Sequence, residues 1–181
     1  MRLASEDLYR RAAAVRLLVL DVDGVLTDGR LYYGDDGHEY KAFHIRDGHG
    51  IKMLQAQGVP VAVISGRRAA SVERRLGELG VAHAWLGTEN KDEAFAELLA
   101  RLGLAAEQVA YVGDDLIDLP VMSRVGLAIA VADADPFVVE HAHWRTARPG
   151  GLGAVREVCE LILAAQGRLG VERTRYLAAN R

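Results

Sequence analysis

The sequence predicts an α/β fold in which a doubly wound, mainly parallel, Rossmann-like sheet is covered by helices on both faces. Short apolar runs rich in β-branched residues alternate with helix-period stretches such as "AASVERRLGELG" and "DEAFAELLARLGL". Strands that alternate with helices are typical of parallel sheets with buried strands. The runs expected to form strands are Leu17–Leu20, Val61–Ile64, Val81–Trp85, Val109–Val112 and Leu127–Val131.

Size and composition favour a single domain over residues 1–181. Half of the 181 residues are hydrophobic, and the net charge of −3 gives no sign of a nucleic-acid partner. The N-terminal stretch lacks the apolar core of a signal peptide, and no apolar run approaches the roughly 20 residues that span a bilayer. The single cysteine, Cys159, excludes an intrachain disulfide. We therefore expect a cytoplasmic protein without a membrane partner.

The first expected strand is followed by a segment that interrupts the α/β alternation. In "GRLYYGDDGHEYKAFHI", residues 29–45, aromatic and β-branched residues flank a turn signal at Asp35-Asp36-Gly37. This pattern predicts a β-hairpin. Ligands of open α/β sheets bind beyond the carboxyl ends of the strands. The hairpin, here called the flap, is thus expected to cover a site, and the next helix is expected in "GHGIKMLQAQG".

The end of the chain is expected to be helical and then to form a tail. The helix-period stretch "GAVREVCELILAAQG" follows Pro149-Gly150-Gly151, which is a typical boundary before a helix. The tail spans about residues 170–181, and the sequence leaves open whether it is ordered.

Polar residues follow three of the expected strands. They are Asp21 and Asp23, then Ser65, Gly66 and Arg67, and finally Asp114, Asp115 and Asp118. Because the ends of parallel strands meet at one edge, these groups are expected to form one carboxylate-rich site. Such a site without His or Cys suits a hard cation, and Mg²⁺ is the usual ion beside phosphate.

The spacing of Asp21 and Asp23 indicates a division of labour between two carboxylates. Residues two apart at a strand end point to the same side, so both can face one reacting atom. An ionised carboxylate is a competent nucleophile toward phosphorus. The second carboxyl group can protonate the leaving oxygen and later accept a proton from water.

Four motifs in order resemble those of the haloacid dehalogenase-like phosphatases: "DVDGVLTD", Ser65, Lys91 and "GDDLID". The resemblance implies that Asp21 is the nucleophile and Asp23 the general acid and base. It also implies that Asp21, the Asp23 carbonyl and Asp114 hold Mg²⁺, while Ser65 and Lys91 bind phosphoryl oxygens. The gaps between motifs are too short for a cap domain. A neighbouring subunit is then the natural source of specificity, and we expect a homotetramer.

Finer motifs resemble the family of 3-deoxy-D-manno-octulosonate 8-phosphate phosphatases. These are "KAFHIRDGHGIK", "ISGRRA", "VAYVGDDLIDLPVM", "VAVADADP" and "GGLGAVREVCELIL", and the similarity runs from about residue 17 to 169. This family releases an eight-carbon sugar acid, a lipopolysaccharide precursor, from a phosphorylated sugar acid. Phosphatases of nine-carbon, sialic-type acid 9-phosphates are the alternative, although they generally lack the "RDGHGI" form.

A substrate with a carboxylate as well as a phosphate requires further cations. Arg46 and Arg67 are the first choices, because a planar guanidinium suits both anions. The other expected contacts are Asp23, His44, Ile45, Asp47, Gly48, Lys52, Gly66, Arg75 and Lys91. Lys52 and Arg75 are the weakest choices, since each can equally be a solvated charge on a helix.

Other interpretations remain open for single residues and for the whole chain. Ser65 can be a helix N-cap and Lys91 a solvated residue, while Asp115 and Asp118 can simply cap or support the next helix. A phospho-accepting receiver module also has an acidic pocket, Mg²⁺, a phospho-Asp and a Lys. A receiver, however, lacks an aspartate like Asp23 and carries its phospho-Asp on a later strand. A catalytically silent scaffold is disfavoured by the full set of reactive residues.

Overall fold

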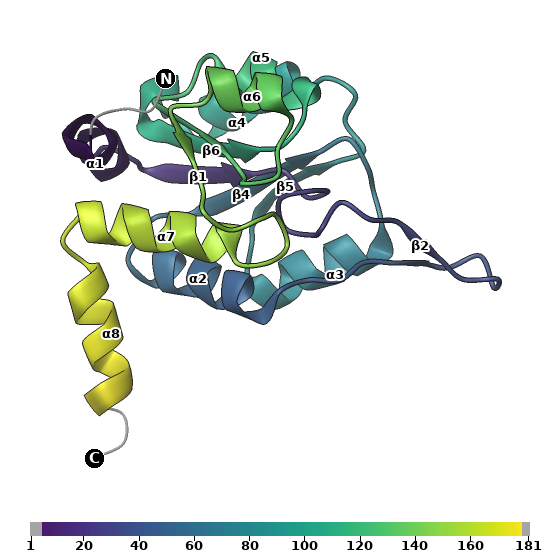
Figure 1. The fold of residues 1–181 in the computed structure, drawn as a ribbon, viewed down its shortest axis with the longest axis horizontal. Helices are drawn as coiled ribbons and strands as arrows, with labels where there is room; N and C mark the ends of the chain where they lie inside the picture. The colour runs from purple at the N-terminus through teal and green to yellow at the C-terminus, as the bar shows by residue number, and fades with distance from the viewer. Residues whose placement is uncertain (1–4, 179–181) are drawn as a thin grey trace.

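The computed structural model describes residues 5–178 and centres on a fully parallel, six-stranded sheet (Figure 1). The strand order is β5-β4-β1-β6-β7-β8. The strands are β1 (Leu17–Leu20), β4 (Val61–Ser65), β5 (His83–Leu86), β6 (Val109–Gly113), β7 (Leu127–Ala130) and β8 (Trp144–Arg145). This arrangement confirms the predicted α/β fold class.

Helices cover both faces of the sheet. They are α1 (Ser5–Ala13), α2 (Ile45–Ala56), α3 (Ala70–Leu79), α4 (Lys91–Leu102), α5 (Leu119–Met122), α6 (Pro136–His141), α7 (Ala154–Ala165) and α8 (Leu169–Ala178), with 3₁₀ turns η1 (Ala106–Gln108) and η2 (Leu116–Asp118). In Figure 1, α4, α5 and α6 lie on one side of the sheet and α2, α3 and α7 on the other.

Alternate strand residues feed two hydrophobic cores, one on each face. On β1, Leu18 and Leu20 pack with α2 and α7, whereas Leu17 and Val19 pack with α4 and α5. All four side chains are fully buried. Because successive strand residues point to opposite faces, a continuous apolar run is what a strand buried on both sides requires. Because β1 is buried on both faces, its apolar run ends at Leu20, and the polar residues of the chain begin directly after it at Asp21.

The predicted flap is present as a short antiparallel hairpin. Its strands are β2 (Tyr32–Tyr33) and β3 (Glu39–Tyr40), with Tyr32 paired to Tyr40. In Figure 1 the hairpin extends away from the sheet on the side where α3 begins. The following helix, α2, begins at Ile45, three residues before the expected helix in "GHGIKMLQAQG". Consequently, Arg46 lies in the first helical turn rather than on a flap arm.

Between the sheet strands the described chain has no room for a cap. The hairpin and α2 connect β1 to β4, and α3 and β5 connect β4 to α4. β8 was not among the predicted strands, and its two residues pair with β7 at the edge of the sheet. The tail forms α8 up to Ala178, while residues 179–181 of the predicted tail lie outside the described part. Among residues 5–178, no helix is long and apolar enough to cross a membrane.

Candidate active site

Three strand ends meet at one edge of the sheet around a pocket of about 240 Å³. Leu20 pairs with Val63 of β4 and Val112 of β6, so the residues that follow converge. The pocket is lined by Asp21, Asp23, Gly29, Ser65, Gly66, Arg67, Asp114, Asp115 and Ile117. A larger pocket of about 660 Å³ lies beside Arg16 and Pro60, but no carboxylate lines it. The smaller of these two pockets is therefore the one that contains the predicted catalytic carboxylates.

Asp21 is the first residue after β1 and only 4% of it is exposed. Lys91, the first residue of α4, donates from Nζ to Asp21 Oδ1 over 2.8 Å. Burial, together with the charge of Asp118, raises the pKa of Asp21 to about 7, against the opposing effect of Lys91. A single lysine thus does not offset the crowded carboxylates, and the site favours an additional cation.

Asp118 is completely buried, and donors occupy both of its carboxylate oxygens. Its Oδ1 accepts from Lys91 Nζ over 2.7 Å and from the Tyr111 hydroxyl over 2.6 Å. Its Oδ2 accepts from the backbone N–H groups of Asp114 over 3.0 Å and Asp115 over 3.3 Å. Asp118 therefore holds Lys91 and the start of the Asp114 loop in place, in line with the supporting role considered for it.

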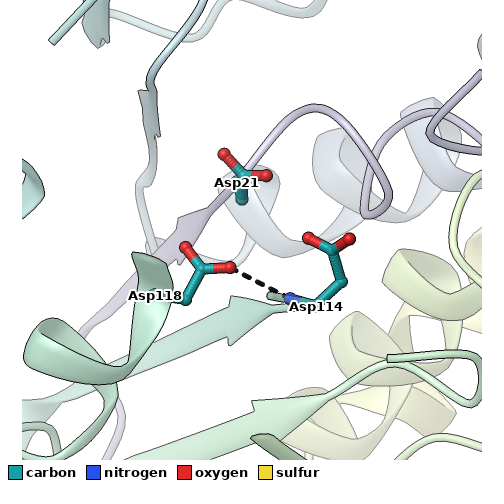
Figure 2. A group of neighbouring side chains, drawn as sticks. All are labelled: Asp21, Asp114 and Asp118. Atoms are coloured by element: carbon teal, nitrogen blue, oxygen red, sulfur yellow. Dashed lines mark hydrogen bonds between the residues drawn. The ribbon is translucent and has the colours of Figure 1, made fainter. Parts of the chain in front are cut away.

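Asp114 is the third carboxylate of the cluster and follows β6 directly. Figure 2 shows its side chain beside those of Asp21 and Asp118. Burial, followed by the charge of Asp21, raises the pKa of Asp114 to about 8. Its carboxylate lies against Gly24, where a Cβ atom would come within 2.0 Å of Asp114 Oδ2, and Gly24 has a φ of +89°. A side chain at residue 24 would thus displace Asp114 and strain the turn.

These residues fit a divalent cation. Carboxylate oxygens of Asp21, Asp114 and Asp118 all lie within 4.8 Å of one another. Because both oxygens of Asp118 already accept hydrogen bonds, Asp21 and Asp114 are the carboxylates with capacity left for an ion. An all-oxygen donor set of this kind suits Mg²⁺. Burial and repulsion between neighbouring carboxylates raise the pKa values of Asp21 and Asp114, and a bound cation would stabilise their ionised forms.

Ser65 and Lys91 lie where the motif order predicts them. Ser65 ends β4, is 2% exposed, and its Oγ accepts from the Arg67 backbone N–H over 3.3 Å. Asn90 caps α4 by accepting from the backbone N–H groups of Asp92 and Glu93, which fixes the start of the helix at Lys91. The side chain of Lys91 is 3% exposed, so it is a buried group and not a solvated one.

Asp23 lies in the same pocket as Asp21 but has different partners. Its Oδ1 accepts from Nζ of Lys41, a flap residue whose side chain is fully buried. Arg67 Nε lies 3.8 Å from Asp23 Oδ2, and the same guanidinium donates to Glu39 over 2.7 Å. Lys41 Nζ also lies 3.2 Å from Glu39 Oε1. The flap therefore contacts the site through alternating charges.

Asp47, a predicted substrate contact, lies outside the set of residues that line the pocket of Asp21. Its carboxylate is buried and accepts from the backbone N–H groups of Gly153 over 3.1 Å and Arg156 over 2.7 Å. These contacts satisfy N–H groups at the start of α7. Neighbouring His44, the N-cap residue of α2, has its Nδ1 3.9 Å from Asp47 Oδ2. Asp47 thus joins α2 to α7 instead of lining the pocket.

The remaining candidates from α2 and α3 also lie outside the pocket of Asp21. Gly48 is buried against the guanidinium of Arg75, which pairs with Glu78 over 3.3 Å. Lys52 and Ile45 are exposed. Arg46 lines a separate pocket of about 280 Å³ with Arg148, Gly153, Arg156, Glu157 and Glu160. Within one chain, the structure does not bring these predicted contacts to the carboxylate cluster.

Sequence reasoning missed the contacts made by Lys41, Glu39 and Tyr111. The alternation in the returning flap arm contains a usable signal, because residues 39 and 41 share one face of an extended strand while Tyr40 faces the other. Tyr40 is 55% exposed, and the side chain of Lys41 is fully buried. No sequence pattern indicated the contact of Tyr111, because a tyrosine within an apolar strand is ordinarily a residue of the hydrophobic core.

Comparisons with known proteins agree with this geometry. Residues 44–126 match the family model of haloacid dehalogenase-like hydrolases. The chain is 53% identical over 165 residues to the 3-deoxy-D-manno-octulosonate 8-phosphate phosphatase of Escherichia coli, covering 91% of this chain and 88% of that protein.

Solved structures show the same likeness. The Yersinia pestis 3-deoxy-D-manno-octulosonate 8-phosphate phosphatase is 53% identical, with a TM-score of 0.91 over 92% of this chain and 90% of that one. The Moraxella catarrhalis enzyme, solved with magnesium, phosphate and KDO, is 38% identical, with a TM-score of 0.92 over 98% and 100% of the two chains. The chain therefore belongs to the haloacid dehalogenase-like hydrolases and, within them, to the family of 3-deoxy-D-manno-octulosonate 8-phosphate phosphatases.

Proposed function

We propose that this chain hydrolyses 3-deoxy-D-manno-octulosonate 8-phosphate to the free sugar acid and phosphate through an aspartyl-phosphate intermediate. The observation that carries the proposal is Asp21, a buried carboxylate at a strand end, paired with Lys91 and facing Asp114. The names of the similar enzymes from Escherichia coli and Yersinia pestis support the substrate.

In the proposed mechanism, an oxygen of the Asp21 carboxylate attacks phosphorus. The bond to the sugar oxygen breaks, and that oxygen leaves with the bonding electron pair and takes a proton from Asp23. Water then attacks the aspartyl-phosphate, gives a proton back to Asp23, and releases phosphate and the Asp21 carboxylate. Ser65 and Lys91 bind the phosphoryl oxygens, and Lys91 neutralises charge as it develops.

The proposed cofactor is Mg²⁺, held by Asp21, Asp114 and the backbone carbonyl of Asp23. When bound, it supplies positive charge at the phosphoryl oxygens. The Moraxella catarrhalis enzyme was solved with a magnesium ion, which supports this choice.

Phosphate release from a panel of sugar phosphates tests the substrate. We expect kcat/KM for 3-deoxy-D-manno-octulosonate 8-phosphate to exceed that for nine-carbon acid 9-phosphates and for hexose phosphates by about 100-fold or more, since a site built for polar groups rejects ligands that leave them unpaired. All rates should vanish in EDTA and return with Mg²⁺. Similar rates on all substrates would contradict the specificity and leave the chemistry intact, whereas preference for a nine-carbon acid would reassign the substrate.

We propose further that the enzyme is a homotetramer in which a neighbouring subunit completes each site. Tyr32, Tyr33 and Tyr40 of the flap and Ile45 at the start of α2 are between 43% and 82% exposed. Exposed apolar groups gathered on one segment are typical of protein interfaces. Arg46 lies beside Ile45 but outside its own chain's carboxylate pocket. A neighbour's Arg46 is thus the proposed ligand for the carboxylate of the substrate.

Complementation between two inactive variants tests this arrangement. Asp21→Asn and Arg46→Ala proteins are expected to be weakly active alone and to regain activity on the sugar acid when co-expressed, because a mixed oligomer contains sites with both residues intact. Light scattering reports the oligomer order. A monomer, or co-expressed variants no more active than the sum of the two, would refute the shared site.

We place the enzyme in the cytoplasm and its product in lipopolysaccharide synthesis. Cys159 is a buried free thiol, which suits a reducing compartment. Burial raises the pKa of this thiol, so the reactive thiolate form is disfavoured.

A further inference from the structure

The two catalytic carboxylates of the proposed mechanism are each held by a different buried lysine. Lys91 contacts Asp21, whereas Lys41 contacts Asp23. Lys91 belongs to the sheet-and-helix body, which is held by the two hydrophobic cores. Lys41 belongs to the flap, whose two strands contain only two residues each. The proposed nucleophile and the proposed acid are thus supported by separate parts of the fold.

The burial of Lys41 indicates a specific role and not an incidental surface contact. A lysine side chain with no exposed area is strongly disfavoured unless its charge is compensated. Here Asp23 and Glu39 compensate it, with Nζ 3.2 Å from Glu39 Oε1. Arg67 closes the group by donating to Glu39 Oε2 over 2.7 Å. The four residues form a ring of alternating charge that joins the flap to the strand ends.

Asp23 depends on this ring for its orientation. Within residues 5–178, the Oδ1 of Asp23 accepts its hydrogen bond from Lys41, and Arg67 Nε lies 3.8 Å from Oδ2. Oδ2 has no hydrogen-bond donor in that part of the chain, so it is the oxygen available to carry the transferred proton. Fixing Oδ1 therefore fixes the direction in which Oδ2 presents that proton.

We propose that Lys41 is a positioning residue, which holds the Asp23 carboxyl group in the orientation needed to protonate the leaving oxygen and thereby couples flap placement to catalysis. This inference rests on the acid role of Asp23 in the proposed function. It assigns to the flap a part in the chemical step besides covering the pocket.

The test compares two small substrates that differ in their need for an acid. Benzyl phosphate releases an alkoxide that must be protonated, whereas para-nitrophenyl phosphate releases a stabilised phenoxide that leaves without a proton. Their similar size makes flap contacts comparable. Because kcat/KM reports the steps through leaving-group departure, its ratio for the two substrates isolates the action of the acid.

For Lys41→Met we expect kcat/KM on benzyl phosphate to fall about tenfold or more, with a change below about threefold on para-nitrophenyl phosphate. Lys41→Arg should restore most of the lost rate. Arg30→Met is the matched control, because it removes a cation from the same flap. The side chain of Arg30 is 76% exposed and pairs with Asp28, not with Asp23. If Lys41→Met fails to fold, Lys41→Gln gives the same comparison.

Equal losses on both substrates would assign Lys41 a purely structural role, and unchanged rates would assign it none; either result overturns the proposal. Asp23→Asn separates this failure from that of the proposed function. If Asp23→Asn affects both substrates equally, the acid role itself is wrong and the inference fails with it. If Asp23→Asn is selective for benzyl phosphate and Lys41→Met is not, only the inference fails.

Discussion

Replacing Asp21 with asparagine is expected to lower kcat by about 10⁴-fold or more while leaving the fold intact. The amide has the shape of the carboxylate but cannot attack phosphorus, and it removes one of the two carboxylates with capacity for Mg²⁺. Stability should change by no more than about 1–2 kcal/mol, because two effects oppose each other. Lys91 loses one partner but keeps Asp118, and the buried carboxylates no longer repel across that position.

Three measurements check this expectation. Phosphate release gives kcat, and urea unfolding gives the free energy of unfolding. Mass spectrometry of acid-quenched reactions should find one added phosphoryl group on Asp21 in the wild-type chain and none there in the variant. Asp35→Asn, at the tip of the flap, is the matched control and should retain wild-type turnover. Turnover of Asp21→Asn within tenfold of wild type would exclude Asp21 as the nucleophile.

The sequence predicted those parts of the fold that follow from local patterns. Leu17–Leu20 was predictable because four consecutive apolar residues followed by two aspartates fit a strand buried on both faces. The flap was predictable from its turn signal. β8 was not, since Trp144 and Arg145 form no apolar run and become a strand only by pairing with β7. The start of α2 was placed late because glycines at 48 and 50 masked the helical turn before them.

The site shows the same limit at the level of single residues. Asp21, Ser65, Lys91 and Asp114 were predictable because each directly follows or ends an apolar strand or opens a helix. The contacts of Asp47 with Gly153 and Arg156 were not predictable, because these partners lie more than one hundred positions away in the chain. Contacts between residues so far apart in the sequence depend on how α2 packs against α7, and no local sequence pattern predicts that packing.

The second large effect is expected for Lys91→Met, in stability as well as activity. Lys91 is nearly fully buried between Asp21 and Asp118, so its loss leaves two buried carboxylates without their cation. Breaking a buried pair in this way costs about 3–5 kcal/mol, and kcat/KM should fall about 10²–10³-fold because charge on the phosphoryl group is no longer neutralised. Arg74→Met is the control, since Arg74 is 84% exposed and its pair with Glu78 contributes less than about 1 kcal/mol.

The pH dependence of this loss identifies its cause. The pKa of Asp21 is raised to about 7 with Lys91 present, and removing the lysine raises it further. Between the usual aspartate pKa of about 4 and the folded value, the native state binds more protons than the unfolded chain, so stability falls as pH rises. In EDTA, Lys91→Met should therefore lose at least about 1 kcal/mol more at about pH 8 than at about pH 5. A loss equal at both pH values would show that Lys91 contributes through packing and not through its charge.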